Sequence, residues 1–506
     1  MKGERFYLQL LVIIFTAIAV LLAVVFAVDL ATAKDPATGK PVSWSELQAS
    51  APMARALTSP CARAANNLIA MLLTFIGLAI PITANLYTPK LIEIFVRDKV
   101  NLCVLGFFSV YAAHTIFAAS TVWDNYFGRL SIGIDIAGAI FGWGLLIPYY
   151  FYVLRFLNPV TIIERVKELI LVEFRNLDRI AGEVRAAQQR LNQKVLHLGS
   201  VIIRAVERAD RDVSLDAIRA LEEVVFTYQH RKSQLPQGWL EAPAELFTGL
   251  SEDALEFLRT DRTWFEHKCL TQLSLAYNAA LAKMPDAVSA ISDALRTIAL
   301  HARSQGDRAT LMLAIRFFNT FVREAIKKKD VHAIYDIMHQ YKVLSRDLMP
   351  THSDVVLEIA RHLKYYADFA RLQGMPFIYE LSSYELGEMV MWAYEREIST
   401  RDDLLAIVLG FEGAAASTRL VKSRAILAGY FLEHAHAAPA DRVRESLEGV
   451  PAAILEQALG EILNTRERSF WEVTDRQVNF DYVDERQKQR VRSFFEDLLG
   501  RAEATR

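Results

Sequence analysis

Cysteine is scarce in this sequence, and a large excess of charge of either sign is also missing. Three cysteines, Cys61, Cys103 and Cys269, lie far apart among 506 residues and form no CxxC pair. This spacing excludes a disulfide framework and argues against a structural zinc site. The formal net charge is −2, whereas nucleic-acid-binding proteins usually carry a concentrated basic surface. We therefore expect no nucleic-acid partner.

The short motifs of common catalytic sites are also missing. The sequence has no GxxxxGK[ST] phosphate loop, no GxSxG, no HExxH and no protein-kinase motif set. His332, Asp336 and His339 share one helix face, but this pattern is far more typical of a solvated face than of a metal site. We expect a protein that is not an enzyme, with no catalytic residues, no cofactor and no metal.

Charged residues are few at the start of the chain and abundant after it. Residues 1–160 hold 19 Lys, Arg, Asp and Glu residues, and residues 161–506 hold 97. The first part therefore has the composition of a membrane region, and the second that of a soluble domain. We predict a transmembrane domain over residues 1–158.

Four apolar stretches are long enough to cross a bilayer, which takes about 20 residues as a helix. They are residues 6–28, 68–86, 102–122 and 130–156. The first resembles a signal peptide, but its apolar run exceeds the roughly 7–15 residues of such signals, so we interpret it as an uncleaved anchor. Residues 29–67 then form a loop between the first two spans.

Lysine and arginine near the span ends set the orientation. Lys2 and Arg5 precede the first span, and Arg155 ends the fourth. An even number of spans then places both termini in the cytoplasm and the 29–67 loop outside. The bias is modest, because the 29–67 loop also carries basic residues.

The remaining sequence has helical periodicity. Asn158 and Pro159 predict a helix start, because Asn caps helices well and Pro suits the first position. We predict a juxtamembrane helix or stalk over 159–199, packed on its own domain or on a neighbouring subunit, and then a cytoplasmic all-helical domain over 200–506. Thirteen helical segments with short linkers and no fixed repeat period predict a bundle or an irregular solenoid. The fold class is all-α.

Polar residues within the spans are candidates for function, because ionisable groups in the bilayer are costly. His114 and Asp135 have depths that differ by roughly 5 Å at 1.5 Å per residue, so they can meet. They form either a proton- or ion-sensitive pair on a pathway or a hydrogen-bonded structural pair. The second span adds further polar or helix-breaking positions, which face either a wet path or other helices: Thr74, Pro81, Thr83 and Asn85.

Two further patterns concern packing and the membrane surface. Gly138 and Gly142 form a small-xxx-small face that lets helices approach closely. Between the second and third spans, apolar residues alternate with Lys90, Arg97 and Lys99. This pattern suits a helix that lies in the inner interface and links the spans to the soluble part.

The stretch from Ala56 to Glu168 resembles a bacterial inner-membrane family known mainly as a domain of unknown function with four N-terminal spans. Three passages carry the resemblance: the small-residue entry to the second span (ARALTSPCARAANNLIAMLLTFIGLAI), the junction NLYTPKLIEIFVRDKVNLCVLGFF and the exit IPYYFYVLRFLNPVTIIERVKE. A fourth, AVERADRDVSLDAIRAL, lacks the Asn-Asp-Pro turn usual in that family. The resemblance implies four spans in the bacterial inner membrane and carries over no activity.

Two functions fit these features. The first is a homo-oligomeric, channel-like or ion-conducting protein that is regulated by its cytoplasmic domain. Four spans are too few to enclose a wide path alone, so a conduit requires self-association. The second is a non-conducting scaffold, anchored in the lipid bilayer, that binds a cytoplasmic protein partner through its helices.

Overall fold

The computed structural model describes residues 51–86, 95, 98–120, 129–176, 184–469 and 478–504. Helices account for the regular structure of these residues, with only an isolated bridge between Ser469 and Val478 besides them. The predicted all-α fold class is therefore confirmed. The chain divides into two compact units, residues 1–166 and 167–506, which are called here the membrane unit and the solenoid unit.

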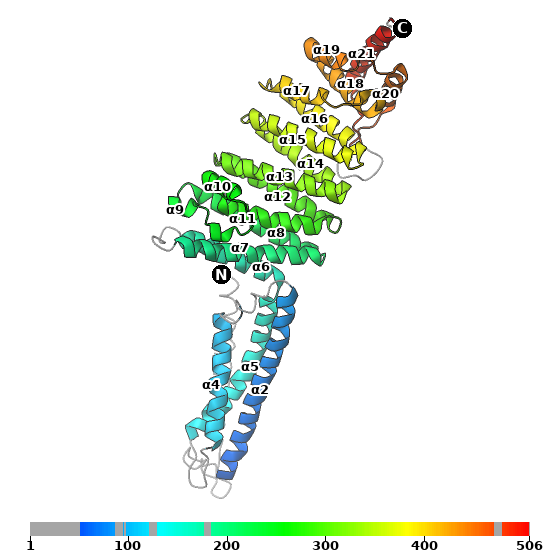
Figure 1. Ribbon diagram of the computed structural model, residues 1–506. Coiled ribbons are helices and arrows are strands. Elements are labelled where there is room, and N and C mark those ends of the chain that lie inside the picture. The colour runs from blue at the N-terminus through cyan, green and yellow to red at the C-terminus, as the bar shows by residue number, and fades with distance from the viewer. Residues whose placement is uncertain are drawn as a thin grey trace. The chain divides into compact units, whose positions relative to one another are not determined.

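Three long helices of the membrane unit are described: α2 (Ala51–Leu86), α4 (Lys99–Ser120) and α5 (Arg129–Phe156), and each packs against the other two (Figure 1). Each contains a window that is long and apolar enough to cross a bilayer. The windows in α4 and α5, Lys99–Ser120 and Ile132–Phe156, agree with the predicted third and fourth spans. The first predicted span, residues 6–28, lies outside the described residues.

The helix of the second span starts earlier than the sequence predicted. Residues 51–67, which we expected in a loop, belong to α2, which also contains the predicted span 68–86. Among its described residues, Arg55–Leu78 is the stretch that is long and apolar enough to cross a bilayer. Leu68 lies beside Gly142 and Phe108, near the middle of α5 and α4. Our prediction of a helix break at Pro81 was wrong, since α2 continues through it to Leu86. Membrane helices tolerate an internal proline when other groups satisfy the backbone.

The predicted helix start at Asn158 and Pro159 is confirmed. Helix α6 spans Pro159–Asn176, and Asn158 Oδ1 accepts a hydrogen bond from the Val160 backbone N–H at 3.0 Å. The single stalk over 159–199 is not what the described residues show. Helix α6 ends at Asn176, and α7 (Val184–Glu207) is a separate helix that packs on α8 and α11 of the solenoid unit.

The solenoid unit is a two-layered stack of helices (Figure 1). Its first layer contains α8 (Arg211–Lys232), α12 (Pro285–Ser304), α14 (Val331–Leu348) and α16 (Pro376–Glu395). Its second layer contains α11 (Trp264–Ala280), α13 (Arg308–Lys328), α15 (Ser353–Leu372) and α17 (Arg401–Leu409). Three short elements lie between α8 and α11: α9 (Gln237–Leu240), η2 (Ala244–Leu246) and α10 (Glu252–Asp261). From α11 to α16, each helix contacts the next one and the one after it.

The central helices recur at a nearly constant interval. Helices α12 to α16 begin at Pro285, Arg308, Val331, Ser353 and Pro376, which are 22 or 23 residues apart. Two consecutive helices therefore form a repeat of about 45 residues, within the range of helical repeat arrays. Our expectation of no fixed period was wrong, and of the two predicted architectures this part of the chain is a solenoid.

A recurring turn produces this interval. The backbone N–H of Asp330 donates to the carbonyl of Ala325 at 3.1 Å, and that of Met375 donates to Ala370 at 3.0 Å. This is the six-residue bond of a Schellman turn, which ends a helix through a left-handed residue, here Lys329 (φ 54°) and Gly374 (φ 83°). Asp330 then caps the next helix through its side chain.

The C-terminal end of the unit is built around α18 (Thr418–Glu433). This helix is enclosed by α16, α19 (Ala437–Glu445), α20 (Ala452–Asn464), α21 (Glu485–Ala504) and the short η3 (Ala414–Ala416). Gly429 allows the close approach of α21, because a Cβ atom at this position would lie 2.5 Å from Val491 Cγ2. The array therefore ends in a compact bundle.

Candidate functional site

His114 and Asp135, the two ionisable residues singled out in the predicted spans, meet inside the membrane unit. His114 Nδ1 lies 2.8 Å from Asp135 Oδ1. The Tyr111 hydroxyl donates to the backbone carbonyl of Asp135 at 2.8 Å. Both contacts connect α4 to α5, so the pair joins two helices of one chain.

The Asp135 carboxyl group is enclosed by the protein. Its side chain is 0% exposed, whereas that of His114 is 29% exposed. A carboxylate in the bilayer needs such a partner, because an isolated charge there is costly. Within the described helices this arrangement agrees with the structural interpretation of the pair, and its role in a pathway stays a prediction.

Gly138 and Gly142 lie where α5 packs on its neighbours. A Cβ atom at Gly138 would be 2.4 Å from Tyr111 Cε2, and one at Gly142 would be 3.2 Å from Phe108 Cε1 and 3.3 Å from Leu68 Cδ1. The absence of side chains therefore lets α5 approach α4 and α2 closely. The small-xxx-small face therefore packs against helices of the same chain.

The other predicted membrane positions are not brought together by the described residues. Thr74 is exposed, and its hydroxyl donates to Ala70 O of its own helix at 2.7 Å. Thr83 and Asn85 belong to α2, but their side chains lie outside the described part. Lys90 and Arg97 also lie outside it, and Lys99 is the exposed first residue of α4. The predicted inner-interface link stays a prediction.

A polar cluster that the sequence did not predict lies where α4 begins and α5 ends. Asp98 Oδ1 accepts hydrogen bonds from the Val100 backbone N–H at 3.0 Å and from the Tyr152 hydroxyl at 2.5 Å. Asn101 is buried, donates to Phe95 O at 2.7 Å and accepts from the Tyr149 hydroxyl at 3.1 Å. The cluster therefore fixes the first turn of α4 against the last turns of α5.

Arg165 extends this cluster to α6. Its Nη1 lies 3.4 Å from Asp98 Oδ2, and its guanidinium lies over the Phe156 ring, 4.1 Å from the centroid. Phe156 packs edge-on against Phe95 at 5.0 Å. We call Asp98, Asn101, Tyr149, Tyr152 and Arg165 the juxtamembrane node. Its members come from two of the passages that carry the family resemblance. Those passages were the sequence feature that could have pointed to this cluster.

Side-chain bonds connect the helices of the first solenoid layer at its half-exposed face and just beneath it. We call the half-exposed face of α8, α12, α14 and α16 the ladder face. Between α8 and α12, Gln229 Oε1 lies 2.6 Å from His301 Nδ1, and the ring of Phe226 stacks on that of His301. Between α12 and α14, Arg296 Nε donates to Gln340 Oε1 at 2.8 Å.

The side-chain bonds continue from α14 to α16 just beneath this face. Lys342 and Glu385 are buried, and Lys342 Nζ on α14 lies 2.5 Å from Glu385 Oε2 and 2.6 Å from Glu388 Oε2 on α16. Trp392 lies next to Lys342 and Arg346, at 5.6 Å from each cationic group. The bonds hold adjacent helices in register, so the ladder face is a continuous and ordered surface.

A buried ionic cluster closes the start of the stack. Lys232 Nζ lies 2.6 Å from Glu266 Oε1 and 2.6 Å from Asp307 Oδ2, and joins α8 to α11 and to the cap of α13. Burial raises the pKa of Glu266, while Lys232 opposes this shift. Beside Glu266 on α11, burial and the nearby Lys268 lower the pKa of His267 to about 4. This imidazole is neutral in the folded chain near neutral pH.

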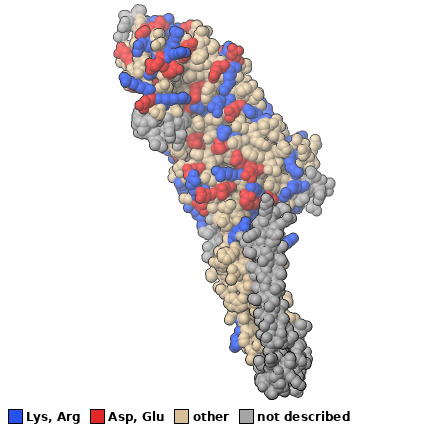
Figure 2. Space-filling model, turned by 180° about the vertical axis from the view of Figure 1, so that it is seen from behind, with Lys and Arg blue, Asp and Glu red and all other residues tan. Residues whose placement is uncertain are grey.

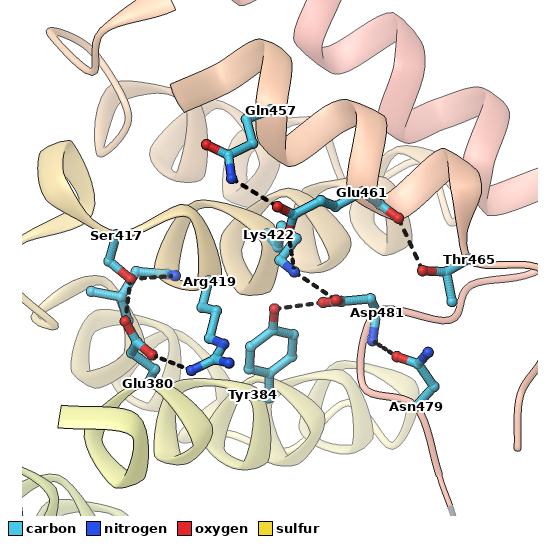
Figure 3. Close-up of polar contacts among 11 residues, drawn as sticks. Glu380, Tyr384, Ser417, Arg419, Lys422, Gln457, Glu461, Thr465, Asn479 and Asp481 are labelled. Atoms are coloured by element: carbon cyan, nitrogen blue, oxygen red, sulfur yellow. Dashed lines mark hydrogen bonds and ion pairs between the residues drawn. The ribbon is translucent and has the colours of Figure 1, made fainter. Parts of the chain in front are cut away.

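A second ionic network holds the C-terminal bundle (Figure 3). Lys422 on α18 is 6% exposed, and its Nζ lies 2.6 Å from both Glu461 Oε2 and Asp481 Oδ2. The Tyr384 hydroxyl of α16 donates to Asp481 Oδ1 at 2.7 Å. The segment between α20 and α21 is therefore pinned to the stack by Asp481.

Metal ligands do not gather in the part of the chain that the structure describes. His332, Asp336 and His339 lie on α14, but no group of three His, Cys, Asp or Glu side chains among the described residues is placed to hold a metal ion. Charged side chains of both signs are interspersed on the surface of the solenoid unit that faces the viewer in Figure 2.

The comparison with protein families finds a match for the N-terminal part of the chain. Residues 5–207 match the family model described as "Predicted membrane protein (DUF2254)". The resemblance to an uncharacterised membrane-protein family is therefore confirmed. The matched region contains the juxtamembrane node and the His114–Asp135 pair, and it ends with α7.

No curated protein matches this chain. No solved structure matches it either. The chain is thus a predicted membrane protein with three described candidate spans followed by an α-helical solenoid.

Proposed function

We propose that this protein is a membrane-anchored scaffold that binds a protein partner on its ladder face. The observation that carries the proposal is the regular stack of helices α12 to α16, which begin 22 or 23 residues apart. Such arrays create an extended surface to which each repeat contributes. The proposal names no enzymatic activity and requires no cofactor.

The chemistry of the ladder face supports a protein partner. It offers half-exposed aromatic, amide and charged groups of both signs, including Phe226, Arg296, Gln340, Glu388 and Trp392. Tryptophan and arginine are enriched at protein interfaces. The inter-helix bonds hold the surface in place before binding, and preorganisation improves affinity. A nucleic acid would instead favour a concentrated basic surface.

The membrane unit supports anchoring better than conduction. The carboxyl group of Asp135 is enclosed within one chain, and the Thr74 hydroxyl is satisfied by its own helix. Each was a candidate to line a path in the channel hypothesis. We also propose that the membrane is the bacterial inner membrane, with both termini and the solenoid unit in the cytoplasm. A reporter fused after Arg506 that is active only outside the cytoplasm would contradict this orientation.

Site-specific photocrosslinking of the full chain in native membranes tests the scaffold proposal. A photoreactive residue replaces Val343, which is half-exposed on the ladder face, and the matched control replaces Tyr365, which is 64% exposed on α15 of the other layer. We expect one discrete protein adduct from position 343 and its absence from position 365. Equal adducts from both layers, or none from position 343, would contradict the proposal.

Reconstitution into liposomes separates the scaffold from the channel. The scaffold proposal expects no ion flux above that of empty liposomes. Flux that changes conductance or selectivity in an Asp135→Asn variant, which is still inserted in the membrane, would favour the channel hypothesis and place Asp135 on its pathway.

A further inference from the structure

The face of α2 that points away from α4 and α5 has an unusual composition for a membrane helix. Asn67, Ala70, Thr74 and Gly77 follow one another at intervals of three, four and three residues, and all four are exposed. The buried residues of α2, such as Leu68 and Leu72, lie on the opposite side. We call Asn67, Ala70, Thr74 and Gly77 the α2 stripe.

The contacts of α2 show how deep this stripe lies. Leu68 packs beside Gly142 and Phe108, and these two residues lie near the middle of the α5 and α4 windows. Asn67 precedes Leu68 directly, so its amide lies within one turn of the middle of the three helices. The ring of Phe75 contacts that of Tyr150 near the end of α5, which places Gly77 close to one membrane surface.

The amide of Asn67 is exposed at this depth. Neither its side chain nor that of its neighbour Asn66 has a hydrogen bond to another residue that the structure describes, and both residues are exposed. Lipid chains offer neither donors nor acceptors, so an unpaired amide in the hydrocarbon region is unfavourable. Polar residues in membrane helices accordingly face other helices or water.

We infer that the α2 stripe is covered by the α2 stripe of a second copy of this chain. A primary amide carries both a donor and an acceptor, so the Asn67 side chains of two copies can hydrogen-bond to each other. Ala70, Thr74 and Gly77 are small enough to let the two helices approach closely. Two copies inserted in the same direction bring identical positions together, and a seven-residue spacing suits such a parallel pair.

The surroundings of the stripe fit a helix pair better than a wet path. Exposed leucine and methionine side chains flank it, namely Met71, Leu73 and Leu78. These apolar groups seal a polar contact from the lipid in a closed pair, whereas a water-filled path would require polar flanks. The inference goes beyond the scaffold proposal, and does not depend on it.

Cysteine crosslinking in native membranes tests this inference. Cys61, Cys103 and Cys269 are replaced by alanine, and Ala70→Cys or Gly77→Cys is introduced into this full-length chain. Val110→Cys is the matched control, because Val110 is 72% exposed on α4, away from the stripe. We expect oxidation to give covalent dimers from positions 70 and 77 and to leave the position 110 variant monomeric.

A second substitution tests the role of the amide. Asn67→Leu should cause a loss of dimer from the Gly77→Cys chain, whereas Leu73→Ala should not. Inserted chains that stay monomeric at both positions 70 and 77, or that dimerise equally at position 110, would overturn the inference. So would a crosslink of monomer mass between Gly77→Cys and a second cysteine placed within residues 6–28, since the first apolar stretch would then cover the stripe.

Discussion

Asp98 and Arg165 are 67 residues apart in the sequence, yet Arg165 Nη1 lies 3.4 Å from Asp98 Oδ2. The contact connects the residue that caps α4 to the second turn of α6. The hydroxyl of Tyr152 reaches the other oxygen of the same carboxylate. One carboxylate therefore fixes three helices at the same end of the membrane unit.

Removing this carboxylate should destabilise the membrane unit. Asp98→Ala deletes a helix cap, worth about 1 kcal/mol, together with hydrogen bonds to a charged group, each worth about 1.5–3 kcal/mol. We expect a clear fall in the unfolding midpoint of the purified protein in detergent. Tyr152→Phe, which removes one hydroxyl, should cost less. Equal midpoints for the two variants would show that the cap and the Arg165 contact contribute little.

A single methyl group at Gly138 should disturb the packing of α5 on α4. The Cβ atom of Gly138→Ala would lie 2.4 Å from the Tyr111 ring, and the Tyr111 hydroxyl is held by Asp135 O. Overpacking of this kind typically costs about 1–3 kcal/mol. Gly133→Ala is the matched control, because nothing lies within 4 Å of that position. Thermal stability in detergent should fall for position 138 alone, and a stable Gly138→Ala variant would contradict the packing.

The His114–Asp135 pair should respond differently to the loss of each partner. His114→Ala leaves a buried carboxylate without its partner, which typically costs about 3–5 kcal/mol. Asp135→Asn replaces the charge with a neutral amide of the same shape and should be much milder. The yield of folded protein from membranes provides the measurement. Similar yields for the two single variants would indicate that Asp135 carries no buried charge.

Lys422 should be essential for the C-terminal bundle. Lys422→Met removes the common partner of Glu461 and Asp481, both of which are only partly exposed. We expect the free energy of unfolding to fall by about 3 kcal/mol, which is at the lower end of the range for a broken buried pair. We also expect faster protease cleavage between α20 and α21. Arg419→Ala breaks the more exposed ion pair with Glu380 and should cost less than about 1 kcal/mol. Equal cleavage rates would argue against the pinning of this segment by Asp481.

Stability should fall as the pH decreases below 6.5 because of His267. Burial and Lys268 lower its pKa from 6.5 to about 4 in the folded chain, so between these values the unfolded chain binds a proton that the folded chain does not. Stability is therefore lost as the pH falls through this window, by up to about 3 kcal/mol. The pH dependence of the urea midpoint should be shallower in His267→Gln and unchanged in His434→Gln, whose histidine is exposed. If the urea midpoint had the same pH dependence in wild type and His267→Gln, the proposed role of His267 would be contradicted.

The parts of the fold that depend on long local patterns were predictable from the sequence. Long, largely apolar runs located α4 and α5 within a few residues, and the Asn158-Pro159 pair located the start of α6. The beginning of α2 was missed because Arg55, Arg63 and two asparagines interrupt its apolar character. The structure shows that these residues belong to the continuous helix Ala51–Leu86.

The regular spacing and the juxtamembrane node were missed for a different reason. The repeat is carried by the geometry of a turn, and Asp330 and Met375 occupy equivalent places in it with unlike side chains. The node joins segments about 50 to 70 residues apart, and its tyrosines are equally typical of residues that anchor helices at a membrane surface. Local sequence patterns contain no information about such long-range pairing.

The recurring turn also means that the length of the stack is not set by closure, as it would be in a barrel or a ring. Each helix between α12 and α16 contacts its near neighbours, so inserting or deleting two consecutive helices leaves the remaining contacts of the same kind in place. Adding or removing whole helix pairs therefore changes the length of the stack and leaves the kind of contact between neighbouring helices unchanged. Arrays with more or fewer helix pairs would in this way differ in the length of surface that they expose.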